Sequence, residues 1–424
     1  MNLLRQKIEQ ELRERGPIPF SHYMELCLYD PELGYYSRNA EQFGKAGDFY
    51  TSSDVHAVFG RLLARQFDEM WRALGSPERV ELVELGPGRG LFAQDVLDWS
   101  EKKFPEFFQA LHYVLIERSP ALCARIKETL AYRIESGKAE LATLDAPEIG
   151  NTSWPTAAAK RRKNAADGAS RGFSEEPTQV PEERKKTPSD DTQPPGAPTI
   201  FFANEFFDAL PVEILSAKGS LCVDARDGRF VETWVQPSPE ELEFLDRYSI
   251  HPEPDERVEA TLVAYKTMDR VAAGIQRGFL LAIDYGYTRE EQLAGRHRGT
   301  LKALRQHSVS ASPYEAPGEQ DITADVNFTA LAAAAEKHGM LTHKLITQSQ
   351  FLLGIGEANQ FADAFEECRL PQERAKVALQ LKHLVTPAGM GESFQALIGS
   401  KGVEREEAAA LAGLNFGHKP TLSR

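Results

Sequence analysis

Cysteine is scarce and scattered in this sequence. The four cysteines, Cys27, Cys123, Cys222 and Cys368, form no C-x-x-C pair, so their spacing indicates neither a disulfide framework nor a zinc site. The histidines show no metal-ligand spacing either, and no metal site is expected. The cysteine pattern fits a reducing, cytoplasmic setting.

Long apolar runs and targeting signals are also missing. No apolar stretch approaches the length of a membrane span. The first residues carry Glu9, Glu11 and Glu14 among their basic residues and contain no apolar core segment, which argues against a signal peptide and a transit peptide. We therefore expect a cytoplasmic protein without a membrane span.

Positive charge is in deficit. The 424 residues include 49 Lys and Arg and 63 Asp and Glu, which gives a formal net charge of −14. This balance argues against nucleic acid as the main partner and permits a basic protein or peptide substrate. The length is ample for a large core and an enzyme.

One stretch, residues 80–90 (VELVELGPGRG), organises the chain. Its apolar run is short enough to be a buried parallel strand, and Gly86, Gly88 and Gly90 then allow a sharp turn into a helix. Burying the Glu84 carboxylate at the end of the strand costs desolvation free energy unless a ligand or another group binds it there. Ligands of open α/β sheets bind beyond the carboxyl ends of strands.

The glycine spacing favours one class of ligand. A dinucleotide fingerprint needs a third glycine where this chain has Leu91. The E-x-G-x-G-x-G pattern instead resembles motif I of class I S-adenosylmethionine (SAM) methyltransferases. An ordinary strand-to-helix turn is the alternative for the glycine loop alone.

A second acid follows the next expected strand. Residues 112–117 (HYVLIE) end in Glu117, where a doubly wound nucleoside-binding fold presents a carboxylate to ribose hydroxyls. Glu117 can also favour the N-terminus of a helix beginning near Ser119, and both readings can hold together.

Polar side chains also end two later expected strands. Residues 199–203 are followed by Asn204, Glu205 and Asp208, and the strand at 278–287 contains Asp284 and Tyr285 near its end. If the acceptor is an arginine, carboxylates here can pair bidentately with its guanidinium. For each acid the alternative is a helix cap or a structural ion pair, and for the tyrosine it is packing.

The fold class predicted from these patterns is α/β: a Rossmann-like, mostly parallel sheet with an N-terminal helical region and helical insertions. We predict N-terminal helices and an aromatic binding loop in residues 1–75, a SAM-binding core in 76–350, and a helical insertion, a last strand and a tail in 351–424. Within the core, 154–198 reads as a disordered insertion and 237–275 as a helical one.

The resemblance extends along nearly the whole chain. The sequence resembles the MidA family, SAM-dependent methyltransferases related to a mitochondrial complex I assembly factor that is a protein-arginine methyltransferase. The matching blocks are GDFYTSSDVHAVFG (47–60), ELGPGRG (84–90), ANEFFDALPV (203–212), IDYGY (283–287), RGTL (298–301), DITADVNF (321–328), TQSQFLLGIG (347–356) and MGESFQALIGSKG (390–402).

The resemblance implies roles for individual residues. The cofactor-binding residues are expected to be Gly47, Asp48, Thr51, Glu84, Gly86, Gly88, Gly90 and Glu117. Asn204, Glu205 and Asp208 are expected where the transferred methyl group emerges, as catalytic residues. The substrate wall is expected to include Phe49, Asp284 and Tyr285.

The chain departs from the family pattern at three places. Ser53 follows the Thr-Ser pair where the family usually has proline, the 154–198 segment is longer than typical, and Glu213 follows the Pro-Val pair where the family often has a basic residue or histidine. The last departure leaves the identity of the substrate open.

The resemblance implies a SAM-dependent methyltransferase acting on arginine of a partner protein, with a respiratory-complex subunit as a candidate. Two alternatives stay open at this point. One is methyl transfer to a small oxygen or nitrogen acceptor. The other is an assembly factor or chaperone that binds SAM and a partner without needing turnover. The sequence does not indicate the oligomeric state.

Overall fold

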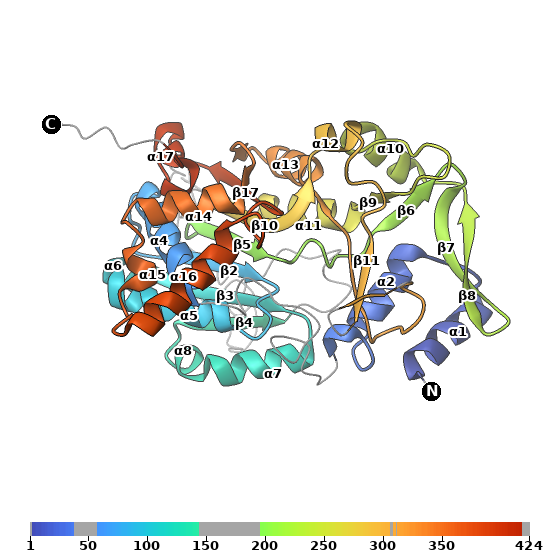
Figure 1. The fold of residues 1–424 in the computed structure, drawn as a ribbon, viewed down its shortest axis with the longest axis horizontal. Helices are drawn as coiled ribbons and strands as arrows, with labels where there is room; N and C mark the ends of the chain where they lie inside the picture. Colours follow the sequence, from blue (N-terminus) through green and yellow to red (C-terminus); the bar gives the residue numbers. More distant parts are fainter. Residues whose placement is uncertain (1, 38–56, 144–195, 306–307, 311, 418–424) are drawn as a thin grey trace, which may run out of the picture.

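Two lobes lie side by side in the computed structural model (Figure 1). The structure describes residues 2–37, 57–143, 196–305, 308–310 and 312–417. One lobe is built on a mostly parallel sheet and the other on antiparallel sheets and the two N-terminal helices.

The first lobe contains the sheet expected from the sequence. Its parallel strands are β2 (Val80–Leu85), β3 (Leu111–Glu117), β4 (Ala139–Thr143), β5 (Thr199–Asn204) and β10 (Gly278–Tyr287). The sheet order is β15-β17-β10-β5-β2-β3-β4, and β17 (Phe394–Lys401) runs antiparallel to β10. Short β14 (Val326–Asn327) extends β10, and short β15 (Leu341–Thr342) and β16 (Ile346–Thr347) pair with β17.

The sheet is covered on both faces, which explains why its strands are apolar runs rather than alternating ones. All six residues of β2 are buried. Leu82 points to the face covered by α4 (Ala57–Ala73), α5 (Leu91–Lys103) and α14 (Gln348–Glu357), while Val83 points to the face covered by α11 (Leu262–Gly274) and α13 (Phe328–Glu336).

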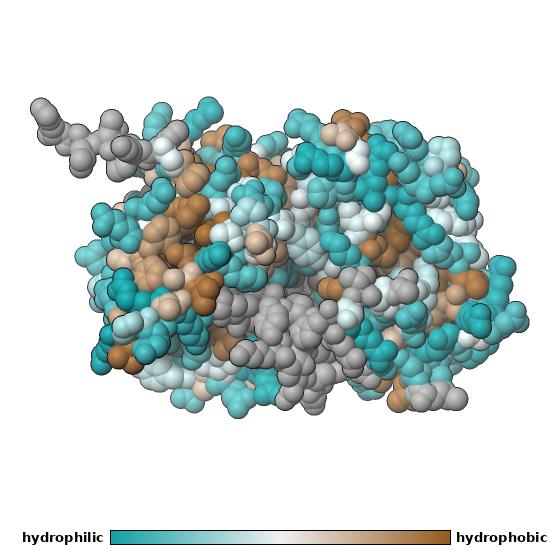
Figure 2. Space-filling model, viewed as in Figure 1, coloured by the Kyte–Doolittle hydropathy of each residue, from teal (hydrophilic) through white to brown (hydrophobic). Residues whose placement is uncertain are grey.

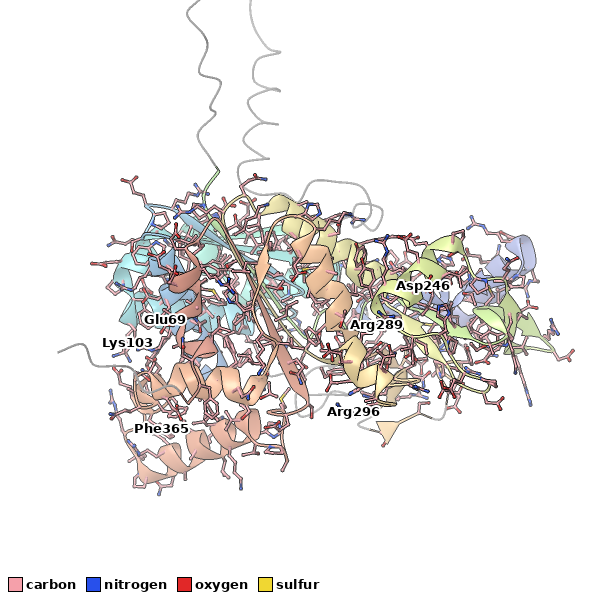
Figure 3. The ribbon with its side chains drawn as sticks, turned by 90° about the horizontal axis from the view of Figure 1, so that it is seen from above. Glu69, Lys103, Asp246, Arg289, Arg296 and Phe365 are labelled. Carbon is pink, nitrogen blue, oxygen red and sulfur yellow. The ribbon has the colours of Figure 1, made fainter. Side chains whose placement is uncertain are left out.

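Further helices complete this lobe. They are α6 (Pro105–Ala110), α7 (Pro120–Thr129), α8 (Ala131–Glu135), α15 (Ala362–Phe365), α16 (Pro371–Val385) and α17 (Arg405–Ala409). Figure 3 shows Glu69 of α4, Lys103 of α5 and Phe365 of α15 on the same end of the lobe. Brown, apolar side chains gather on the side of α14 and α16 in Figure 2, where Leu370 and Leu379 are exposed.

The second lobe joins segments that lie far apart in the sequence. The helices α1 (Leu3–Arg15) and α2 (Phe20–Tyr29) pack on β1 (Ile18–Pro19), β6 (Glu213–Ser216), β7 (Gly219–Arg226) and β8 (Arg229–Val235). The strand β9 (Val258–Ala260) pairs with β6 in the same sheet. A small sheet of β11 (Lys302–Arg305), β12 (Ser308–Val309) and β13 (Asp321–Thr323) adds to the same apolar core.

Three expectations about the elements need revision. The single strand expected over 340–347 is the separate pair β15 and β16. The segment 237–275 is not purely helical, because β9 lies between α10 (Pro239–Tyr248) and α11, and α11 covers the main sheet. The N-terminal region does not form one unit, because α1 and α2 belong to the second lobe whereas α4 packs on the first.

The carboxyl end of α10 is held by a side chain from α12 (Arg289–Leu293). Arg289 donates from Nε to the Ser249 carbonyl at 2.8 Å and from Nη2 to the Asp246 carbonyl at 2.9 Å. Figure 3 shows Asp246 and Arg289 near each other. A cation that satisfies the last carbonyls of a helix stabilises that helix end.

Among the described helices, none combines the length and the apolar character that a membrane crossing requires.

Candidate SAM and acceptor site

A cavity of about 780 Å³ lies at the carboxyl ends of β2, β3, β5 and β10, where the second lobe faces the main sheet. This volume falls in the range typical of small-molecule sites. The residues that line it from the first lobe include Glu84, Gly86, Gly88, Arg89, Leu91, Ile116, Glu117, Leu122, Asn204, Glu205, Phe206, Asp208, Tyr285, Met390 and Phe394. The second lobe and its connections contribute Tyr29, Tyr36, His297, Lys302, Leu304, Asp321, Thr323 and Asp325.

The glycine loop has the backbone that a close-fitting ligand requires. Gly86, Gly88 and Gly90 have φ values of 64°, 54° and 76°, a region that other residues adopt at a cost. A Cβ on Gly86 would lie 2.8 Å from Cδ2 of Phe206. The loop therefore packs against the turn that follows β5, and α5 begins directly after it with no side-chain cap on its first N–H groups.

Glu84 is buried at the end of β2. Its Oε2 accepts a hydrogen bond from the Tyr113 hydroxyl at 2.8 Å, and Tyr113 lies on the neighbouring strand β3. Burial raises the pKa of Glu84 to about 8, and the nearby Glu117 adds to the rise. A cationic ligand in the cavity would favour the ionised form of this acid.

Glu117 occupies the corresponding position at the end of β3. Its Oε1 accepts hydrogen bonds from the backbone N–H groups of Arg118 at 2.9 Å and Ser119 at 2.8 Å. Ser119 in turn caps α7. Glu117 thus supports the start of this helix and lines the cavity at once, as the sequence allowed. Burial raises its pKa to about 7.

The turn after β5 carries the next two polar groups. Asn204 donates from Nδ2 to Oε1 of Glu205 at 3.1 Å. Glu205 adopts φ of 50°, a conformation uncommon for a residue with a side chain and often found at functional sites. Both residues line the cavity next to the glycine loop.

Asp284 holds this turn from behind. Its Oδ2 accepts hydrogen bonds from the backbone N–H groups of Phe206, Phe207 and Asp208 at 3.2, 3.0 and 3.3 Å. Its Oδ1 accepts one from Tyr285 N–H at 2.9 Å. Asp284 is fully buried and is not among the residues that line the cavity in the described part of the chain. The sequence analysis expected Asp284 in the substrate wall. The structure instead places Asp284 behind that wall.

Asp208 and Tyr285 do face the cavity. Burial raises the pKa of Asp208 to about 6, a hydrogen bond with the Tyr285 hydroxyl opposes that rise, and Asp325 adds to it. Within the described residues, Oδ1 of Asp208 is buried without a hydrogen-bond partner. The carbonyl of Asp208 accepts the Ala324 N–H at 3.0 Å, which ties the turn to the second lobe.

The second lobe supplies a carboxylate that the sequence analysis did not nominate. Asp321 on β13 is buried, and its Oδ1 accepts a hydrogen bond from the Tyr36 hydroxyl at 2.9 Å. Both residues line the cavity. The DITADVNF block contains Asp321, but no period or spacing in the sequence indicates that β13 lies beside the end of β5.

Lys302 and His297 contact the other second-lobe acid, Asp325. Asp325 accepts from Nζ of Lys302 at 3.1 Å through Oδ1, and its Oδ2 lies 2.9 Å from Nδ1 of His297. The Lys302 ammonium also lies 5.1 Å from the centre of the Tyr285 ring, within the range of a cation–π contact. These three lining residues were also missed from the sequence.

Some expected site residues cannot be placed. Gly47, Asp48, Phe49 and Thr51 lie outside the described residues. Glu213, the departure from the family pattern, lies on β6, where its carboxylate accepts a hydrogen bond from the Ser21 hydroxyl. It is not among the described residues that line the cavity, so this departure concerns the packing of α2 on β6.

The comparison with protein families decides the class. A family model described as "Putative S-adenosyl-L-methionine-dependent methyltransferase" matches residues 62–346, which include the glycine loop, the turn after β5 and the acids of the second lobe. The chain belongs to this family. It is a SAM-dependent methyltransferase.

Individual relatives agree along most of the chain. The chain is 29% identical to the Drosophila melanogaster "Protein arginine methyltransferase NDUFAF7 homolog, mitochondrial", over 94% of this chain and 85% of that protein. It is 26% identical to the human protein arginine methyltransferase NDUFAF7, over 91% of this chain and 80% of that protein.

A solved structure has the same fold. A Burkholderia thailandensis protein, crystallised with bound S-adenosyl-homocysteine, is 27% identical, has a TM-score of 0.73, and matches 96% of this chain and 94% of its own. The predicted class I fold and the predicted donor, SAM, are both confirmed. The glycine loop of this SAM-dependent methyltransferase, with its positive φ values and its open cavity, fits such a ligand.

The expected cytoplasmic location is wrong. The NDUFAF7 relatives, from fly to human, are named as mitochondrial proteins. The expectation rested on scattered cysteines and on a mixed-charge N-terminal segment, and neither feature identifies one compartment.

Proposed function

We propose that this methyltransferase transfers the methyl group of SAM to an arginine side chain of a protein substrate. The observation that carries the proposal is the gathering of three carboxylates, Glu205, Asp208 and Asp321, in the wall of a cavity that also contains the SAM-type glycine loop. A guanidinium is the side-chain acceptor that such a set of acids suits best, because it offers planar pairs of N–H donors. The names of the relatives support the same acceptor.

On the donor side, we assign Glu84 and the three glycines to the methionine end of SAM and Glu117 to its ribose. Bound SAM supplies an activated methyl group on a cationic sulfur. The residues of the chain then hold the donor in line with the acceptor nitrogen and exclude water from the cavity. The buried acids Glu84 and Glu117 suit a cationic amino-acid portion and ribose hydroxyls respectively.

On the acceptor side, Glu205 has the central role. Its turn packs against the glycine loop through Phe206 and Gly86, which supports Glu205 as the acid next to the donor. Asn204 fixes the direction of the Glu205 carboxylate through the hydrogen bond between them. Asp321 approaches from the second lobe, so a guanidinium between Glu205 and Asp321 would be held from both lobes. Tyr285 forms part of the aromatic wall. The roles expected for Gly47, Asp48, Phe49 and Thr51 stay predictions.

The test is to label a mitochondrial lysate with SAM that carries a radioactive methyl group and to identify the modified residue by mass spectrometry. The proposal expects label on arginine of a discrete protein, and a respiratory-complex subunit is the candidate that the resemblance implies. Label confined to small molecules would contradict the arginine proposal in favour of a small acceptor. SAM binding without any labelling would favour a scaffold that acts through partner binding.

A further inference from the structure

We propose that Asp284 is a positioning residue of the methyl-transfer reaction. It shapes the turn after β5 (residues 204–208) and so makes Asp208 the group that takes the proton released by the substrate guanidinium. This inference rests on the proposed function, since it assigns a role within the same acceptor site. It also changes the place of Asp284 from the substrate wall to the layer behind it.

The first support is the hydrogen bonding of the turn. Three consecutive N–H groups, from Phe206 to Asp208, converge on one oxygen of Asp284. This arrangement forces the chain to bend immediately after Glu205, whose φ of 50° would be costly in an unsupported loop. A buried carboxylate with several backbone donors is a rigid anchor, so the positions of Glu205 and Asp208 both depend on it.

The second support concerns the proton. Both oxygens of Asp284 accept backbone N–H groups, and the side chain is buried behind the wall, so Asp284 does not meet the acceptor itself. Asp208 has an oxygen without a hydrogen-bond partner among the described residues. Of the two neighbouring acids, Asp208 is the one that lines the cavity, so it is the one that can reach the proton of the acceptor.

The surroundings of Asp208 set its proton affinity. The groups that face it are Asp284 and Tyr285 of β10, Asp325 after β13, and the side chains of Tyr29 and Tyr36. Burial, with a smaller contribution from Asp325, raises the pKa of Asp208 to about 6. A carboxylate with a raised pKa is a better base than an exposed one.

The reaction then balances. As the acceptor nitrogen bonds to the methyl carbon, the bond between that carbon and the sulfonium sulfur breaks, and the electron pair stays on sulfur. One N–H proton of the guanidinium passes to Asp208. The products are neutral S-adenosyl-homocysteine, a methylguanidinium that keeps its single positive charge, and a neutral Asp208 carboxyl.

The experiment compares kcat/KM against pH for wild type, Asp284→Asn and Tyr285→Phe, using labelled SAM and a peptide from the acceptor found in the lysate. The acidic limb is expected near pH 6 in wild type. Asp284→Asn removes a like charge and should move this limb about one unit lower. Tyr285→Phe removes a hydrogen bond to the carboxylate and should move it higher. Lower rates with an unmoved limb in both variants would overturn the inference, because a purely structural role predicts that result.

A second readout needs no acceptor. Carbon-13 NMR of aspartate carboxyl groups, with Asp208→Asn to identify the resonance, measures the pKa of Asp208 directly in wild type, Asp284→Asn and Tyr285→Phe. The inference expects a lower value in Asp284→Asn and a higher value in Tyr285→Phe, and unchanged values would contradict it. If Asp284→Asn does not fold, Asp284→Glu takes its place, because it keeps a carboxylate but moves its oxygens, and an unchanged pKa of Asp208 in that variant would contradict the inference. Absence of arginine labelling by wild type would contradict the proposed function while this titration still decides the arrangement of the two acids.

Discussion

The Tyr113 hydroxyl donates a hydrogen bond to Oε2 of Glu84 at 2.8 Å, and both side chains are buried where β2 and β3 lie side by side. Glu84 can therefore keep a proton at neutral pH, since burial raises its pKa to about 8. A cationic ligand that pairs with the carboxylate must first displace this proton. The pair thereby couples ligand binding to pH.

The first prediction concerns SAM affinity. If the Glu84 carboxylate holds the cationic end of SAM, binding releases a proton below pH 8, and the Kd falls by up to about tenfold per unit as the pH rises from 6 to 7.5. Isothermal titration in buffers with different ionisation enthalpies measures both the Kd and the released proton. Glu84→Gln should bind more weakly and show a flatter dependence. A wild-type Kd that does not change with pH would remove Glu84 from this role.

The second prediction concerns stability without ligand. The folded-state pKa of Glu84 lies above its ordinary value of 4.5, so its contribution to stability is full below about pH 4.5 and is lost as the pH rises through about 8. Glu84→Gln keeps an acceptor for Tyr113 and cannot ionise. Its free energy of unfolding should exceed that of wild type by a growing margin between pH 5 and 8, reaching a few kcal/mol. Denaturant titrations at several pH values measure this margin, and a constant difference would contradict the prediction.

The third prediction concerns the glycine loop. Gly86 has a positive φ, and a Cβ there would press against the Phe206 ring. Gly86→Ala should therefore abolish SAM binding and destabilise the fold. Gly137→Ala is the matched control, because Gly137 has φ of 71° and nothing lies within 4 Å of its built Cβ. The control should lose only the conformational cost, about 1–2 kcal/mol, and retain SAM affinity. Equal effects in calorimetry of the two variants would show that the contact with Phe206 is unimportant.

The fourth prediction concerns the carboxylate from the second lobe. Asp321→Asn should raise the KM for the acceptor peptide roughly tenfold, the loss expected for one charge-assisted hydrogen bond, and leave the Kd for SAM unchanged. Tyr36→Phe should have a smaller effect in the same direction, because it frees the Asp321 carboxylate from a donor that orients it. Glu213→Gln, outside the cavity lining, serves as the control. A changed Kd for SAM with an unchanged KM for the acceptor would place Asp321 on the donor side instead.

The part of the cavity lining next to the glycine loop could be predicted because its signals are local. The run that forms β2, the three glycines after it and Glu117 at the end of β3 all lie within one βαβ unit, where strand period and turn chemistry determine the geometry. The fold class followed from the same alternation of apolar strands and helices.

The acceptor half could be predicted only in part, because it depends on contacts between distant segments. The sequence analysis nominated Glu205 and Asp208, which follow β5 directly, but it missed Asp321, whose position depends on how β13 packs in the second lobe. It also assigned Asp284 to the wall, since a strand end does not reveal which side of a turn an acid occupies. The second lobe itself was missed because its core joins residues from α1 to β13, and no single period in the sequence links them.

The central claim is that Glu205 holds the acceptor while a separate set of residues binds SAM. The most direct test measures transfer of a labelled methyl group to the acceptor protein, together with the Kd for SAM, in wild type and Glu205→Gln. The account predicts a loss of transfer of about 100-fold or more with a nearly unchanged Kd. Equal labelling by the two proteins would contradict it.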